Sequence, residues 1–169
     1  VEEAGAVCRK DAENVPDNAQ VWFNLGVLLH ERGRQDEAID VFRKAIQVQP
    51  EYWNAYLGLG ELLEKAGRLE EADRILSRLV ATDARQYDGW LFLARVRRRL
   101  GDISAADRAV RKALEGRPSR AEYWAEYFMV GKQFEDLGQA DRAMAIYRAV
   151  VGARPQDAEA RDRLLRLSQ

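Results

Sequence analysis

The chain has 169 residues, of which 47 % are hydrophobic and 33 % are charged, and its formal net charge is −1. The length fits one domain, and the apolar fraction is sufficient for a packed core, which excludes a disordered chain. No apolar run approaches the length of a membrane-spanning helix, and the near-neutral charge argues against broad attraction to nucleic acid or anionic membranes. The charge is uneven, because residues 87–120 carry nine Lys/Arg against four Asp/Glu.

A period of 34 residues organises the chain. Gly33, Gly67 and Gly101 lie 34 residues apart, Gly138 follows 37 residues later, and an alanine stands five residues after each glycine. Glycine adopts the left-handed conformation at a helix end at little cost, so each of these glycines predicts the turn of a helical hairpin. Aligning the segments gives four repeats, at residues 19–52, 53–86, 87–120 and 124–157.

Each repeat is expected to open with an amphipathic helix. Counted from the first residue of a repeat, the fourth, seventh, eighth and eleventh places fall on one helical face. The fourth place is always Trp or Tyr, the eighth is always Gly or Ala, and Arg97 is the one charged residue on this face. The small eighth place lets the second helix approach closely, so a tight hairpin is predicted. The second helices are expected to stop before Pro50, Ala84, Pro118 and Pro155.

The ends and one irregularity complete the pattern. Residues 1–15 match the back half of a preceding repeat, because Pro16 falls 34 residues before Pro50. Residues 158–169 predict a capping helix, with Leu164, Leu165 and Leu167 packing back on the array.

Three residues, Ala121, Glu122 and Tyr123, are inserted between the third and fourth repeats. Ser119 and Glu122 have the spacing of a capping box, so the insertion is expected to lengthen the next helix at its start. The alternative is a longer loop. Whichever form it takes, the insertion should make this array differ from a regular one near residues 119–124.

The succession of an aromatic residue, Leu, Gly, a large residue, Ala, a second large residue, Ala and Pro resembles the tetratricopeptide repeat family. This resemblance implies an all-α fold, a right-handed α-solenoid of helix-turn-helix repeats, whose first helices line a concave groove. Two specialised forms of the family are disfavoured. A carboxylate clamp needs Lys and Asn where Phe23 and Val27 stand, and an asparagine ladder needs Asn throughout the sixth place, where only Asn24 fits.

The groove implied by the resemblance should be lined by the second, fifth, ninth, twelfth and thirteenth places, which point away from the core. The fifth place is apolar in every repeat, which suggests a stripe of anchors for a ligand; the alternative is that this row partly supports packing. A basic cluster in the third and fourth repeats suits a ligand carboxylate, although cations also favour a helix C-terminus. The predicted groove residues are Phe23, Val27, Leu57, Glu61, Leu91, Arg95, Arg98, Arg99, Phe128 and Lys132.

Catalysis has little support in this sequence. The single histidine, His30, and the single cysteine, Cys8, form neither a His-based metal site nor a disulfide. His30 is expected at an exposed place and Cys8 at a buried apolar one. No phosphate-binding loop or nucleophile motif is present. We therefore predict no catalytic residue, no metal and no cofactor, and expect that the chain is not an enzyme.

The expected function is a scaffold for protein–protein interaction that binds a peptide or an amphipathic helix in its groove. The alternative is a structural or oligomerisation module that stacks through its terminal helices and leaves the groove idle. Nucleic-acid binding would rest on residues 95–99 alone, and it is disfavoured because phosphate binding needs many distributed cations. A soluble segment of this kind suits the cytoplasm or a bacterial periplasm, and the sequence does not name the partner.

Overall fold

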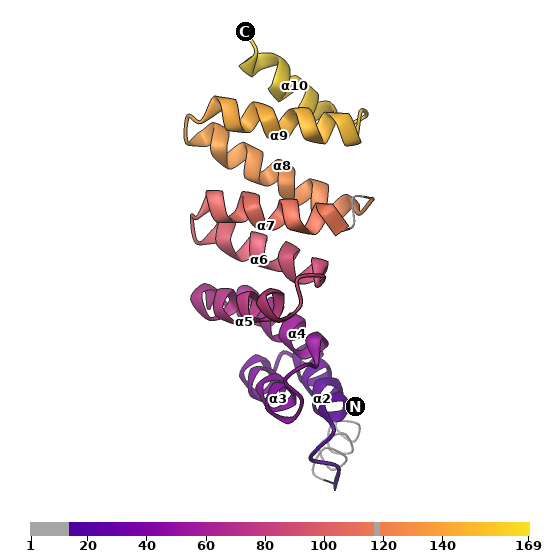
Figure 1. The fold of residues 1–169 in the computed structure, drawn as a ribbon. Helices are drawn as coiled ribbons and strands as arrows, with labels where there is room; N and C mark the ends of the chain where they lie inside the picture. The colour runs from indigo at the N-terminus through magenta and orange to yellow at the C-terminus, as the bar shows by residue number, and fades with distance from the viewer. Residues whose placement is uncertain (1–13, 117–118) are drawn as a thin grey trace. The chain divides into compact units, whose positions relative to one another are not determined.

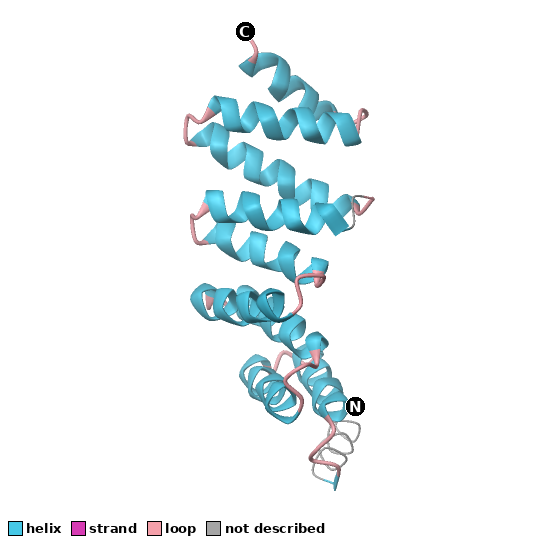
Figure 2. Cartoon of the chain, viewed as in Figure 1, coloured by secondary structure: helices cyan, strands magenta, loops and turns pink. Residues whose placement is uncertain are grey.

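The computed structural model describes residues 14–116 and 119–169, and over these ranges the chain consists of α-helices joined by short loops, with no β-strand (Figure 2). The prediction of an all-α fold is confirmed. Residues 1–13, which include most of the expected partial repeat and Cys8, lie outside the described residues. The chain divides into two compact units, residues 1–84 and 85–169. The single continuous array expected over residues 1–169 stays a prediction.

Both units are stacks of helical hairpins (Figure 1). The first unit contains α2 (Ala19–Glu31), α3 (Gln35–Val48), α4 (Trp53–Lys65) and α5 (Leu69–Thr82). The second contains α6 (Tyr87–Arg99), α7 (Ile103–Gly116), α8 (Ala121–Asp136), α9 (Ala140–Ala153) and α10 (Ala158–Leu167). Within the units α2 pairs with α3, α4 with α5, α6 with α7, and α8 with α9, and these pairs fall inside the predicted repeats.

Each hairpin turns at the predicted glycine. Gly33 has a φ of 74°, and its N–H donates to the His30 carbonyl at 2.9 Å, while the Arg34 N–H donates to the Leu29 carbonyl at 3.0 Å. These two bonds satisfy carbonyl groups that the end of α2 leaves without intrahelical partners. The same pair of bonds recurs at Gly67, Gly101 and Gly138, which all have positive φ.

Small residues bring the two helices of a hairpin together. A Cβ atom built on Gly26 would lie 2.6 Å from Cε1 of Phe42, and one on Gly60 would lie 2.6 Å from Cδ2 of Leu76. A side chain at either place would displace the large residue of the second helix. The helices are therefore held close by the absence of a side chain at these places.

The three-residue insertion lengthens α8, as predicted. This helix has 16 residues, against 13 each in α2, α4 and α6, and it begins at the first inserted residue, Ala121. The predicted capping box is wrong, because the N-cap is Arg120 and its side chain makes no cap hydrogen bond. Arg120 Nε instead donates to Glu122 Oε2 at 3.3 Å. The N-cap falls one residue later than the box requires.

Tyr123, the last inserted residue, fills a place in the core of the second unit. Its side chain is 0 % exposed, and its hydroxyl donates to Asp88 Oδ1 in the first turn of α6 at 2.6 Å. The insertion thus adds a buried aromatic residue that links α8 to α6, a role that the sequence pattern did not indicate.

The last helix, α10, caps the second unit by packing on α9, as Figure 1 also shows. Leu164 and Leu167 pack against the core, as predicted. Leu165 does not, since 58 % of it is exposed. It follows Leu164 by one position and therefore points to a different side of the helix.

A half-buried polar network ties α10 to α8 and α9. Glu135 Oε2 accepts hydrogen bonds from Arg163 Nη1 at 2.8 Å and from the Tyr147 hydroxyl at 2.7 Å. Arg163 Nε also donates to Glu159 Oε1 at 3.1 Å. Burial opposes ionisation of Glu135, but the bonds from Tyr147 and Arg163 outweigh burial and lower the pKa of the Glu135 carboxyl. Burial, together with the bond to Glu135, raises the pKa of Tyr147.

This network predicts that acid loosens the cap. A carboxyl whose pKa is lower in the folded chain stabilises the fold above its ordinary pKa, and that contribution disappears as the pH falls through the lowered value. We expect amide hydrogen exchange in α10 to accelerate below about pH 4, after correction for the intrinsic exchange rate. Glu135→Gln should accelerate exchange in α10 already at neutral pH and remove most of the acid dependence. An α10 whose protection is the same in both proteins at every pH would contradict the prediction.

Candidate functional site

A hollow of ≈ 310 Å³ lies between α2 and α4 of the first unit. Four of its lining residues are predicted groove residues: Phe23 and Val27 from α2, and Leu57 and Glu61 from α4. They belong to the fifth and ninth places of the first two repeats, so these two places do share one surface. The other lining residues are His30, Phe42, Asn54, Gly58 and Leu62.

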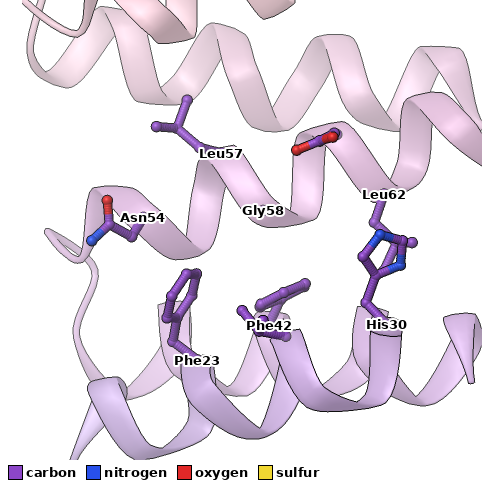
Figure 3. A pocket seen from close by; sticks show the side chains of 9 residues that line it. Phe23, His30, Phe42, Asn54, Leu57, Gly58 and Leu62 are labelled. Atoms are coloured by element: carbon purple, nitrogen blue, oxygen red, sulfur yellow. The ribbon is translucent and has the colours of Figure 1, made fainter. Parts of the chain in front are cut away.

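The floor of the hollow is aromatic. Phe42 reaches it from α3 and is 3 % exposed, and its ring centroid lies 5.6 Å from that of the half-buried Phe23. Figure 3 shows the two rings between α2 and α4, with Asn54 near one end and His30 near the other. Tyr52 also contacts Phe23, with ring centroids 5.6 Å apart in an edge-on arrangement. These contacts hold Phe23 in place at the wall of the hollow.

Gly58 keeps the space open. A Cβ atom there would lie 3.1 Å from Cζ of Phe42 and 3.5 Å from Cε2 of Phe23, so any larger side chain would enter the hollow. The corresponding residue of the second unit is Met129, which follows Gly58 at the spacing of Trp53 and Trp124. Sequence reasoning considered this sixth place only as a possible asparagine row and missed its role.

His30 is half-buried at the edge of the hollow, although an exposed position was predicted. Its Nδ1 atom is shielded from solvent and has no hydrogen-bond partner. A polar atom in this state is unfavourable by roughly 1–3 kcal/mol, and a bound group that reached it would remove that cost. His30 occupies the twelfth place of its repeat, one of the places expected to face a ligand, so the signal was present in the sequence.

Charge at the hollow is modest. Glu61 lies on the rim, and its Oε1 forms an ion pair with Lys65 Nζ at 2.8 Å. Both side chains are about half exposed. An exposed pair of this kind contributes little to stability and is readily exchanged for a partner's charge. The lining is otherwise apolar apart from Asn54 and His30.

In the second unit, one of the predicted groove residues is buried in the core. Leu91 is 8 % exposed and belongs to the hydrophobic core of this unit, so the expectation that it anchors a ligand is corrected. Phe128 is half-buried, and its ring centroid lies 5.5 Å from that of Tyr147. The apolar fifth place is therefore half-buried at Phe23, Leu57 and Phe128, and it is buried in the core only at Leu91.

Most cations of the predicted basic cluster already contact carboxylates or aromatic rings of the same unit. Arg98 pairs with Glu126 through both Nε and Nη2, and their side chains are only 19 % and 8 % exposed. Lys132 Nζ lies 3.6 Å from Glu159 and 5.9 Å from the Phe128 ring.

The other two arginines of the cluster lie elsewhere on α6. The guanidinium of Arg95 lies 5.0 Å from the Phe92 ring centroid, and Arg99 is exposed. Arg98 in particular is held by an internal partner, so we do not retain it as a ligand contact.

Neither a metal-binding cluster nor a membrane-spanning helix is present in the described part of the chain. Within residues 14–116 and 119–169, no cluster of His, Cys, Asp and Glu side chains has an arrangement suited to a metal ion. Over the same ranges, none of the helices combines the length and the apolar character that crossing a bilayer requires.

Comparison with known families identifies the repeat. One model described as Tetratricopeptide repeat matches residues 4–48 and 91–158, and a second model of the same description matches residues 29–89. The chain belongs to the tetratricopeptide repeat family. The TPR assignment agrees with the resemblance carried by the aromatic, glycine and alanine places. Comparison with curated protein sequences gives no match.

Solved TPR structures share the fold at low sequence identity. MamA from Desulfovibrio magneticus RS-1, in a form spanning residue 41 to its end, is 20 % identical with a TM-score of 0.76, covering 93 % of this chain and 88 % of that one. YrrB, described as a TPR protein with an unusual peptide-binding site, is 20 % identical with a TM-score of 0.75, covering 95 % and 81 %. These likenesses confirm the prediction of an α-solenoid.

A third structure contains a bound peptide. The first TPR of Spaghetti (RPAP3) was solved with the HSP90 peptide SRMEEVD, and it is 19 % identical with a TM-score of 0.67, covering 70 % of this chain and 94 % of that one. At this identity the likeness concerns the fold.

Proposed function

We propose that this chain is a protein-interaction module and that the hollow between α2 and α4 binds a peptide or amphipathic helix through one apolar side chain. The observation that carries the proposal is the convergence of Phe23, Val27 and Leu57 on a hollow that Gly58 keeps open. Concave sites with mostly apolar walls and a few polar groups are typical ligand sites. The proposal assigns no catalysis and no cofactor to the chain.

The geometry favours a single apolar anchor over a row of four anchors. Phe23 and Leu57 line the hollow, whereas Leu91 is buried in the core of the second unit. Burying one Leu or Phe side chain contributes about 1.5–3 kcal/mol, and each 1.4 kcal/mol changes affinity about tenfold. A single well-seated anchor therefore accounts for about a ten- to hundredfold change in affinity.

Other TPR structures support the class of ligand. YrrB is described as having a peptide-binding site, and the RPAP3 domain was solved with a peptide. The carboxylate-clamp residues that the sequence would need at its fifth and ninth places are absent, since Phe23 and Val27 occupy them. An apolar anchor rather than a terminal carboxylate is therefore the feature that we assign to the ligand.

The experiment uses peptides selected from a random display library on the intact chain, with affinities measured by fluorescence anisotropy. For peptides that bind the hollow, Leu57→Ser is expected to weaken binding about tenfold or more, because it removes apolar wall area. The matched control is Leu137→Ser, which alters a leucine that is 59 % exposed and lies outside the hollow. Selected peptides that are all insensitive to Leu57→Ser would rule out this site.

A second candidate function is self-association through the terminal helix. The observation behind it is Leu165 of α10, which is 58 % exposed on the helix that caps the second unit. Light scattering at increasing concentration would then show a rising mass that Leu165→Ser abolishes. A constant monomer mass for the unaltered chain would remove this candidate and leave the peptide proposal intact.

A further inference from the structure

The second unit contains another hollow, of ≈ 400 Å³, that no groove residue lines. It lies over α8 between α7 and α9, and it is lined by Arg111, Leu114, Glu115, Trp124, Tyr127 and Ala149. Its aromatic floor directly follows the three-residue insertion. The predicted groove is formed by first helices, whereas this site combines one first helix, α8, with the second helices α7 and α9.

The first unit shows how the equivalent space is filled. Trp53 and Tyr56 in α4 correspond to Trp124 and Tyr127 in α8, and each pair has ring centroids 6.2 Å apart. The same spacing relates Arg78 of α5 to Ala149 of α9. In the first unit the Arg78 guanidinium lies 5.8 Å from the Tyr56 ring centroid. In the second unit the alanine leaves that volume empty.

A cation already lies over Tyr127, but it belongs to α7 and not to α9. The Arg111 guanidinium of α7 is 5.2 Å from the Tyr127 ring centroid, and Arg111 Nε donates to Asp107 Oδ1 at 2.8 Å. The residue of the first unit that corresponds to Arg111 is Arg43. Its Nη2 donates to Glu71 Oε2 at 2.8 Å. A second cation inserted beside Ala149 would meet Arg111, so the empty volume favours an apolar side chain over a basic one.

The lining itself has one basic and one acidic residue, Arg111 and Glu115, so the charge around the inserted side chain is set by the other exposed residues of α7 and α9. The exposed basic residues of α7 and α9 outnumber the exposed acidic residues, Glu115 and Asp141. Burial raises the pKa of the Tyr127 hydroxyl to about 12, so the floor carries no negative charge at neutral pH. The exposed basic residues of the two helices are Arg108, Arg111, Lys112, Arg142 and Arg148.

We propose that the hollow between α7 and α9 is a second docking site, which takes an aromatic side chain of an acidic peptide segment. The aromatic side chain occupies the volume that Arg78 fills in the first unit and lies on Trp124 and Tyr127. Carboxylates on either side of it meet the basic residues of α7 and α9, among which arginine offers bidentate geometry. This site is independent of the hollow between α2 and α4.

The test titrates the intact chain with a fluorescein-labelled peptide that has one tryptophan flanked on each side by two glutamates. Two matched peptides replace the glutamates with lysines or the tryptophan with alanine. The acidic tryptophan peptide is expected to bind saturably and at least about tenfold more tightly than either control, with binding that weakens as salt increases. No saturable binding, or equal binding of the lysine peptide, would overturn the proposal.

Ala149→Arg is the decisive variant, because its long side chain would occupy the hollow, although it would there stand beside Arg111. The added positive charge alone would strengthen binding of an acidic peptide, so a loss of about tenfold or more can be assigned to filling the hollow. Arg148→Glu changes the charge without filling the space and should also weaken binding. Leu57→Ser should leave this peptide's affinity unchanged, which separates the test from that of the proposed function. Unchanged affinity of Ala149→Arg would refute the site.

Discussion

Tyr123→Ala is expected to destabilise the second unit by about 3–5 kcal/mol, the range for removing a buried aromatic side chain. Tyr123 is 0 % exposed, lies in the core of this unit, and donates a hydrogen bond to Asp88 at 2.6 Å. Tyr123→Phe keeps the ring and removes only the bond, so it should be destabilising by about 1.5–3 kcal/mol, as for bonds to charged groups. The measurement is urea unfolding followed by hydrogen exchange in α6 and α8.

The control for this prediction is a neighbour in the same insertion. Glu122 is exposed, and Glu122→Ala should change the free energy of unfolding by less than about 0.5 kcal/mol. If Tyr123→Ala behaved like Glu122→Ala, the insertion would be an incidental lengthening of α8. The structure instead makes it the source of a buried link between α8 and α6.

Leu91→Ser is expected to destabilise the second unit by about 2–5 kcal/mol, because it leaves a cavity and buries a hydroxyl group. Leu57→Ser, at the same place of the preceding repeat, should cost about 1 kcal/mol or less, because Leu57 is half-buried at the edge of the hollow. Thermal unfolding followed by circular dichroism compares the two variants. Similar melting temperatures would show that both leucines lie at the surface, as the sequence pattern suggested.

The hairpins were predictable because their causes are local. A glycine at the end of α2 and a small residue facing the second helix act within about twenty residues of each other, as Gly33 and Gly26 show. The start of α8 at Ala121 followed from the 37-residue step for the same reason. The capping box failed because its two residues fix a spacing but not the residue at which the helix begins.

The candidate site was predictable only in part because burial depends on distant residues. Phe23 and Leu91 occupy the same place in their repeats, yet one lines a hollow and the other is buried in a core. Arg98 pairs with Glu126, which stands 28 residues further along the chain. Neither outcome follows from the face of a single helix.

Each of the two hollows exists because one residue has a small side chain or none. Gly58 in place of a larger residue opens one, and Ala149 in place of an arginine opens the other. The alignment of repeats contains both differences. Their significance becomes clear only when the neighbouring aromatic rings are placed, since the same substitution elsewhere would open no space.

The most direct test of the central claim is nuclear magnetic resonance of the isotope-labelled chain with a peptide chosen by display and sensitive to Leu57→Ser. The account predicts nuclear Overhauser contacts between the apolar anchor of the peptide and the side chains of Phe23, Val27 and Leu57. Contacts confined to α5 or α10 would contradict it, because the peptide would then bind outside the hollow between α2 and α4.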